Sequence, residues 1–459
     1  MHAREVEEDN SSMKSVRNLL LALLAAMTLV PALNALEKQP ASAYHARRVA
    51  LAAKLHGGIA VLFAAEESEV DFDPYRQDSD FYYLTGWNEP GAALLIVDEA
   101  KEPVARPYKE VLFLPTRNLA MEKYTGAKLD AASPGVTQAT GVDEVQPLTE
   151  LPAELSRLIA ADYRLARHLW AQPDNAQARA LLDWTAATLG AKGVPPPGDA
   201  ARLTMELREV KEFGEIDLLK KATDASIDAQ RVMMRSVKPG VTERTVAGKM
   251  TAVWYEHGCE RPAYFPIVGS GIDSTILHYS ENSRTIEDGD IVVIDAACEY
   301  SMYASDITRT VPANGRFTPR QREIYNVVLG AQQAAIDAFV AGKSTINDRD
   351  RKDPNSLDTA AYNYINTHGK DLHGEPLGRY WLHGLGHMVG IDVHDPADYP
   401  AVLKPGMVFT IEPGVYIPEE KLGVRIECDF LVGPDGKLID LDAALPHTAD
   451  EVEAAMREK

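Results

Sequence analysis

The first part of the chain alternates short apolar runs with stretches of helical spacing. The runs are GGIAVLFAA at 57–65, GAALLIVDEA at 91–100 and EVLFLPT at 110–116. Apolar runs of this length predict buried strands, and their alternation with helices is typical of an α/β domain. We therefore expect an α/β domain over residues 36–190.

A linker and three helices are predicted next. The stretch GAKGVPPPGDAARL at 190–203 holds three prolines and three glycines, so we place a linker at 191–203. Residues 206–237 carry apolar residues at helical spacing, and a second helix is expected after Thr242. Thr318-Pro319-Arg320-Gln321 has the pattern of a capped helix start with proline at the first position, which predicts a third helix to about residue 341.

Strand-like runs lie between and after these helices. They are DIVVIDAA at 290–297, MVFTIEPG at 407–414 and VRIECDFLV at 424–432. Long helices with a strand-rich centre predict a second domain, of the α+β class, over residues 204–459.

Four carboxylates interrupt or end apolar runs of this second domain. They are Asp295 in IVVID, Asp306 in YASDITRT, Glu412 in VFTIEPG and Glu427 in VRIECDF. One such acid is commonly an edge or surface residue, but four are harder to explain because a buried unpaired carboxylate is costly. Two divalent cations would balance four carboxylates, and oxygen-rich ligation suits Mn²⁺. The spacing alone leaves both interpretations open.

The stretch HGLGHMVGIDVHD at 383–395 is rich in histidine. His383 and His387 are four residues apart, as in a helical zinc motif, but Gly384 stands where that motif has glutamate. Two glycines in the first four residues also argue against a helix interior. If these histidines bind a metal, their partner ligands must come from elsewhere in the chain.

Taken together, these motifs resemble the proline-specific metallopeptidases with the pita-bread fold, namely the Xaa-Pro aminopeptidases (aminopeptidase P) and prolidases. The resemblance extends over residues 204–458 and follows the family order HYSEN, IVVID, YASDITRT, HGLGH, VFTIEPG and VRIECDF. It implies a dinuclear metal site in which Asp306 and Glu427 bridge the two ions. The implied ligands are Asp295, Asp306, His387, Glu412 and Glu427.

The resemblance also assigns roles to residues outside the ligand set. His278 would line the substrate site, and one of the remaining histidines, His383 or His394, would steady the substrate or the tetrahedral intermediate. His394 is implied as the group that protonates the departing proline nitrogen, which a histidine can do near neutral pH. Arg425 shares strand parity with Glu427 and is expected to position site carboxylates by paired hydrogen bonds. Each histidine taken alone could be structural.

Residues 73–96 resemble the N-terminal domain of aminopeptidase P more closely than that of short bacterial prolidases. We therefore expect an Xaa-Pro aminopeptidase that hydrolyses the N-terminal residue from peptides with proline second, by a hydroxide bound to both metals. A prolidase is the alternative, and a metal-free binding module of the same fold is a remote one because all five ligand positions are filled. The expected metal is Mn²⁺, with Zn²⁺ or Co²⁺ possible; the expected partners are proline-containing peptides and further copies in a dimer or tetramer.

Composition argues against two further classes of protein, those that bind nucleic acids and those held together by disulfides. The net charge of −21 and an isoelectric point near 5.0 argue against a nucleic-acid partner, because that affinity needs Lys and Arg to neutralise phosphates. The three cysteines, Cys259, Cys298 and Cys428, are few, odd in number and not in a C-x-x-C motif, so no disulfide framework is expected. Strand parity predicts Cys298 and Cys428 to be buried, facing away from the ligands.

The N-terminus has the pattern of a secretory signal. Lys14 and Arg17 precede an apolar run, which a proline and small residues ending at Ala35 follow. The run is shorter than the roughly 20 residues that span a bilayer, so we expect no stable membrane anchor after processing. Residues 1–35 are interpreted as an N-terminal extension with a signal peptide, and the mature protein as periplasmic or secreted. A cytoplasmic protein with a buried N-terminal helix is the alternative.

Overall fold

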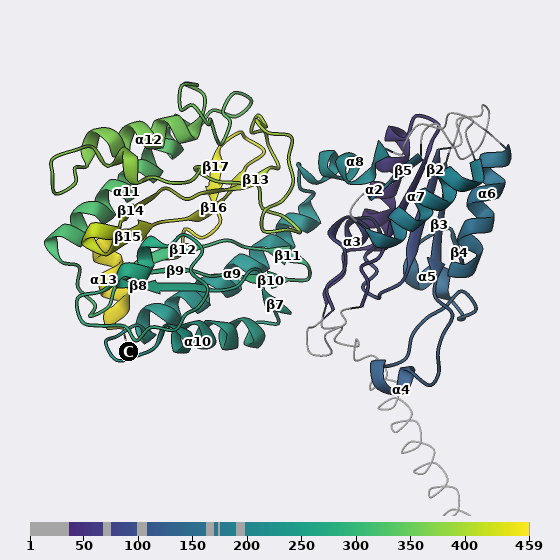
Figure 1. Cartoon of the computed structure of the whole chain (residues 1–459), viewed down its shortest axis with the longest axis horizontal. Helices are drawn as coiled ribbons and strands as arrows, with labels where there is room; N and C mark the ends of the chain where they lie inside the picture. The colour runs from purple at the N-terminus through teal and green to yellow at the C-terminus, as the bar shows by residue number, and fades with distance from the viewer. Residues whose placement is uncertain are drawn as a thin grey trace, which may run out of the picture. The chain divides into compact units, whose positions relative to one another are not determined.

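The computed structural model describes residues 36–67, 75–98, 108–161, 169–172, 175–189 and 198–458 (Figure 1). The expected signal peptide, residues 1–35, lies outside the described residues, so export stays a prediction. Within the described ranges, no helix is both long enough and apolar enough to cross a membrane.

The N-terminal domain is built on a six-stranded mixed sheet of order β4-β3-β2-β1-β5-β6. Its strands are β1 Ile59–Phe63, β2 Ala93–Asp98, β3 Tyr108–Leu114, β4 Glu144–Pro147, β5 Leu169–Ala171 and β6 Gly198–Asp199. The three apolar runs form β1, β2 and β3, which confirms their prediction as strands. β6 falls within the segment expected to be a linker, so this sheet takes in chain beyond residue 190.

Helices pack against this sheet because its central strands β1 and β2 are apolar on both faces. Every residue of β1 is buried, and the core includes Ile59, Val61 and Leu155. The helices of this part are α2 Ala41–Lys54, α3 Ser79–Thr85, α4 Glu122–Thr125, α5 Val136–Thr140, α6 Leu151–Ala161, α7 Ala176–Leu189 and α8 Ala200–Arg208, with the short η1 Leu148–Glu150. The domain is thus of the predicted α/β class.

The long helices of the second domain begin where the sequence indicated. Thr242 caps α10 through a hydrogen bond from Thr245 N, and Thr318 with Gln321 forms a capping box at α11. The apolar stretch at 206–237 is divided between α8 and α9, because Glu212 starts a new helix with its own capping box. These helices are α9 Phe213–Ser236, α10 Glu243–Glu256, α11 Pro319–Ala338, α12 Leu357–His368 and α13 Ala449–Arg457, with η3 Gly271–Thr275, η4 Leu377–Tyr380 and η5 Pro418–Glu420.

Antiparallel strands form the centre of this domain and lie between α9 and α10 on one side and α11 and α12 on the other (Figure 1). They pair as β8-β9-β12, β13-β16-β17, β14-β15 and β7-β10-β11. The bounds are β7 Arg261–Pro262, β8 Ile267–Ser270, β9 Ile291–Asp295, β10 Cys298–Tyr300, β11 Tyr303–Ala304, β12 Thr308–Pro312, β13 Val408–Ile411, β14 Gly414–Ile417, β15 Leu422–Arg425, β16 Cys428–Val432 and β17 Leu438–Asp440. The predicted α+β architecture is confirmed.

The cysteines differ from the expectation in one respect. Cys259 and Cys298 form a disulfide across a sequence separation of 39, so the expectation of no disulfide was wrong. The pairing depends on β10 lying against β7, where Cys298 is opposite Pro262, and such a contact cannot be read from cysteine spacing. Cys298 and Cys428 are both buried, as strand parity predicted.

Candidate metal centre

Strand pairing brings the five expected metal ligands together from distant parts of the chain. Asp295 is the last residue of β9 and lies opposite Thr308, which starts β12 just after Asp306. Ile411 and Cys428 are partners in the β13–β16 pair, so Glu412 and Glu427 face each other at its end. The fifth residue, His387, lies on the loop that precedes β13 and contacts it through Thr410 N–H, which donates to His387 O.

The side chains of these residues converge on a small volume, and we call them the five-residue cluster. Potential ligand atoms lie within 4.8 Å of one another in two overlapping groups, and Glu427 belongs to both. His387 Nε2 is 3.3 Å from Asp306 Oδ2 and 3.5 Å from Glu412 Oε1. The two groups are His387, Glu412 and Glu427, and Asp295, Asp306 and Glu427.

The electrostatics of the cluster favour bound cations. Burial, followed by repulsion from Asp306, raises the pKa of Glu427 well above its usual range, and burial raises the pKa of Glu412 to about 7. The buried oxygens Asp295 Oδ1 and Asp306 Oδ1 have no hydrogen-bond partner among the described residues. Divalent ions would supply both the missing partners and the opposing charge. Four carboxylates and one imidazole therefore fit hard divalent metal ions.

Arg425, the last residue of β15, organises two of these carboxylates. Its Nη2 donates to Asp295 Oδ2 at 2.5 Å, and its Nε donates to Thr308 Oγ1 at 3.1 Å. Thr308 Oγ1 in turn donates to Glu427 Oε2 at 2.5 Å. The expectation of paired hydrogen bonds to carboxylates was wrong in detail, because Arg425 contacts Asp295 directly and Glu427 only through the threonine.

Three hydroxyl residues at the cluster were missed from the sequence. Tyr416 OH accepts from Arg425 Nη1 at 2.9 Å and lies 2.8 Å from His383 Nε2. The pKa of Tyr264 is raised by burial and then by the charge of Asp295, which places its hydroxyl beside the carboxylates. Thr308 shares strand parity with Asp306, so the sequence could have predicted it to face the cluster. Nothing in the sequence pointed to the two tyrosines.

The three remaining histidines lie around the cluster in different settings. His383 is bracketed by Tyr416 and by its neighbour's carbonyl, Gly384 O, and burial followed by the charge of Arg425 lowers its pKa to about 4. The His394 ring is exposed and meets the His387 ring edge-on at 4.2 Å between centroids. His278 is exposed. The structure thus brings His383 and His394 close to the five-residue cluster.

A cavity of about 800 Å³ opens beside His387 and His394. Its walls include Arg349 and Tyr399, and its volume is in the range of cavities that hold small ligands, roughly 300–1,000 Å³. A short peptide could therefore reach the five-residue cluster from this side.

The loop that carries His394 is anchored by the next residue. Asp395 is buried, and its carboxylate accepts from Arg208 Nη2 at 2.6 Å and from Lys211 Nζ at 2.9 Å. Although burial opposes ionisation, these two cations hold the pKa of Asp395 below its usual range. The backbone at His394 is therefore fixed by ion pairs from α8 and the segment that follows it.

Comparisons with known proteins agree with this architecture. Residues 217–434 match the family model of metallopeptidase family M24, and residues 44–166 match the aminopeptidase P N-terminal domain. The Xaa-Pro aminopeptidases of Haemophilus influenzae and Escherichia coli are 33% and 34% identical, over 91% and 90% of this chain and 98% and 97% of their own. The solved structure of proline aminopeptidase P II from Yersinia pestis superposes with a TM-score of 0.79 at 33% identity, covering 91% of this chain and 99% of that one.

An α/β domain followed by a pita-bread domain with a carboxylate-rich cluster defines a metal-dependent hydrolase. This chain belongs to metallopeptidase family M24 and has the domain arrangement of its aminopeptidase P members.

Proposed function

We propose that the protein is an Xaa-Pro aminopeptidase, which removes the N-terminal residue from peptides that have proline in the second position. The observation that carries the proposal is the five-residue cluster beside the cavity at His387 and His394. The activity named for the relatives of similar length agrees with it.

The five-residue cluster would hold two divalent ions, with Asp306 and Glu427 shared between them. When bound, such ions polarise a carbonyl and activate water for attack. The surrounding residues hold the ligands: Arg425 binds Asp295 Oδ2 and Thr308 binds Glu427 Oε2, so the second oxygen of each carboxylate is left for an ion. Oxygen-rich ligation favours Mn²⁺, with Zn²⁺ and Co²⁺ as alternatives.

His394 is the proposed proton donor. The amide before proline carries no N–H, and its nitrogen must gain a proton when the bond breaks. His394 lines the cavity next to His387, so its ring can reach a bound peptide. His383 is kept neutral by its lowered pKa, and it would steady the substrate or the tetrahedral intermediate by exchanging its contact with Tyr416 OH for one with the substrate. His278, which is exposed, would line the substrate site.

The alternative is an Xaa-Pro dipeptidase, and peptide length separates the two. The protein is stripped with chelator, refilled with Mn²⁺ and assayed on matched Xaa-Pro dipeptides and Xaa-Pro-Yaa tripeptides. We expect a higher kcat/KM for the tripeptides than for the dipeptides. Peptides with alanine in place of proline should not be hydrolysed. A preference for the dipeptides would replace this proposal with the dipeptidase.

The same assay ranks the metals. Equal protein samples refilled with Mn²⁺, Zn²⁺ or Co²⁺ are compared at equal occupancy, measured by elemental analysis. We expect Mn²⁺ to give the highest turnover. Higher turnover with Zn²⁺ at equal occupancy would contradict the choice of Mn²⁺ and leave the peptidase proposal intact.

We further propose that the protein is exported and forms a homo-oligomer. The first proposal rests on the sequence before Ala35, and N-terminal sequencing of protein from its native host should find a mature start near Leu36. An intact Met1 or Met13 would overturn it.

The second proposal is the homo-oligomer. Analytical ultracentrifugation should give a dimer or tetramer, and a monomer at assay concentration would overturn this proposal.

A further inference from the structure

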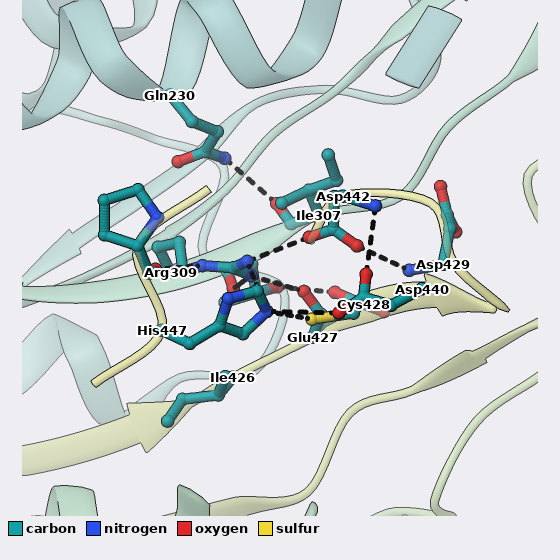
Figure 2. Close-up of polar contacts among 12 residues, drawn as sticks. Gln230, Ile307, Arg309, Ile426, Glu427, Cys428, Asp429, Asp440, Asp442 and His447 are labelled. Carbon is teal, nitrogen blue, oxygen red and sulfur yellow. Dashed lines mark hydrogen bonds and ion pairs between the residues drawn. The ribbon is translucent and has the colours of Figure 1, made fainter. Parts of the chain in front are cut away.

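A second group of potential metal ligands lies on the other side of the strand that follows Glu427. Cys428 begins β16, Asp440 ends β17, and Asp442 and His447 lie on the segment before α13. One ligand atom from each lies within 4.8 Å of those of the other three (Figure 2). We call these four residues the cysteine–histidine cluster. The proposed peptidase reaction uses none of them.

His447 is in direct contact with Cys428 in this cluster. His447 Nε2 lies 3.0 Å from Cys428 Sγ and 3.6 Å from Asp440 Oδ2. Gln332 Nε2 donates to the same sulfur at 3.4 Å. Burial raises the pKa of the Cys428 thiol, so an ion would have to displace its proton. A set of thiolate, imidazole and carboxylate is the ligand chemistry of Zn²⁺, whereas the five-residue cluster offers no sulfur.

The charges around the cluster leave room for one divalent cation. Buried Arg309 donates to Asp442 Oδ2 at 2.9 Å, so one positive charge faces two aspartates and a thiol. With Cys428 as thiolate, three negative charges would be balanced by the guanidinium and one divalent ion. Arg309 would then act as the outer partner that orients Asp442.

His447 is also crowded in a way that an ion would relieve. Its Nε2 has one lone pair, yet both Arg309 Nη2 and the Cys428 thiol lie 3.0 Å from it. An ion that replaced the thiol proton would take the lone pair, and Arg309 would keep Asp442 Oδ2 and Pro446 O as acceptors.

A path for an ion exists on the solvent side. The side chains of Asp440 and His447 are 28% and 21% exposed, although Cys428 and Asp442 are buried. His447 also lines a cavity of about 430 Å³, together with Leu445 and Glu451. A hydrated cation can therefore approach His447 without opening the core.

We propose that Cys428, Asp440, Asp442 and His447 form a binding site for one Zn²⁺-type divalent cation, separate from the five-residue cluster. A bound ion would join β16, β17 and the segment before α13, and so fasten the C-terminal part of the chain to the strand behind Glu427.

The test uses Co²⁺ as a spectroscopic probe in the full-length, metal-stripped protein, without reductant. Co²⁺ bound to a thiolate has an intense near-ultraviolet charge-transfer band, which oxygen and nitrogen ligands do not give. The chain has three cysteines and two form the disulfide, so the band would report Cys428 alone. We expect this band in the wild type, together with one Co²⁺ more than the five-residue cluster holds.

Variants locate the site. Cys428→Ser should abolish the band, and His447→Gln and Asp440→Asn should each weaken Co²⁺ binding at this site by at least tenfold. His257→Gln, which changes an exposed histidine outside the cluster, is the matched control and should leave the band unchanged. If His447→Gln does not fold, the partly exposed Asp440 provides the same test.

Absence of the band in wild type at saturating Co²⁺ would overturn the proposal. The proposal would also be overturned if both His447→Gln and Asp440→Asn bound Co²⁺ at this site, followed by the band, as tightly as the wild type does. Peptidase turnover with Mn²⁺ is measured on the same samples, so failure of this site and failure of the proposed peptidase activity are separate outcomes.

Discussion

Arg425 and Asp295 form a buried ion pair at the five-residue cluster, with Arg425 Nη2 donating to Asp295 Oδ2 at 2.5 Å across 130 residues of sequence. The pair uses one carboxylate oxygen and leaves Asp295 Oδ1, which is buried, without a hydrogen-bond partner among the described residues. The guanidinium therefore occupies one carboxylate oxygen and leaves the other available to an ion.

Replacement of Arg425 tests that relationship. Arg425→Ala removes donors to Asp295, Thr308 and Tyr416, so we expect kcat/KM on an Xaa-Pro-Yaa peptide to fall by roughly 100-fold, with stability lowered by about 3–5 kcal/mol. Arg425→Lys keeps the charge but not the forked geometry, and we expect an intermediate loss. Steady-state kinetics and urea unfolding give both values. A kcat/KM for Arg425→Ala within a factor of about two of wild type would contradict this role.

His387→Ala tests the ligand set. The imidazole lies close to both Asp306 and Glu412, so its removal should abolish turnover and release at least one metal equivalent while the protein stays folded. Elemental analysis after dialysis and circular dichroism provide the measurements. The exposed His373, replaced in the same way, is the control and should retain full metal content. Wild-type turnover of His387→Ala after refilling with Mn²⁺ would remove the ligand assignment.

His394→Ala tests the proton donor. General acid catalysis contributes a factor of about 100 or more, so we expect kcat to fall by roughly that factor while metal content is kept. KM should change less, because a proton is needed most in the transition state. Kinetics on an Xaa-Pro-Yaa peptide with parallel metal analysis separates the two effects. If kcat stays within a factor of about two, His394 is structural.

Asp78→Asn is expected to stabilise the protein at neutral pH. Asp78 caps α3, with Oδ1 accepting from Phe81 N and Gln172 Nε2, and an asparagine oxygen can keep both bonds. Burial and then Asp80 raise the pKa of Asp78 from 3.8 to about 6. The native protein therefore ionises this carboxyl at a cost of roughly 1–3 kcal/mol at pH 7, since one pKa unit corresponds to about 1.4 kcal/mol.

The pH dependence gives the sign of this effect. Below pH 3.8 Asp78 is protonated in both the folded and the unfolded chain, so the gain from asparagine is absent there, grows between pH 3.8 and about 6, and is constant above that. Urea unfolding across that range measures it. Asp348→Asn is the control, because backbone N–H donors hold the pKa of Asp348 below its usual value and the substitution should give no gain. Equal stability of Asp78→Asn and wild type at pH 7 would contradict the expectation.

The sequence predicted the residues whose chemistry conflicts with their surroundings. Asp295 stands out because it ends an apolar strand, and Glu427 because it lies between two such runs. Tyr264 and Tyr416 could not be predicted, because a tyrosine in an apolar segment needs no explanation until its hydroxyl meets a partner. The Cys259–Cys298 disulfide was missed for the same reason, since it depends on the contact of β7 with β10.

The anchoring of Asp395 has a consequence for anyone who shortens or transplants the catalytic domain. The metallopeptidase match begins at residue 217, whereas Arg208 and Lys211 precede it. A protein cut at that boundary would keep Asp395 buried but lose both of its cations, and an uncompensated buried charge costs about 3–5 kcal/mol. The shortest fragment that keeps the loop of His394 anchored must therefore begin no later than Arg208, before the residue at which the family match starts.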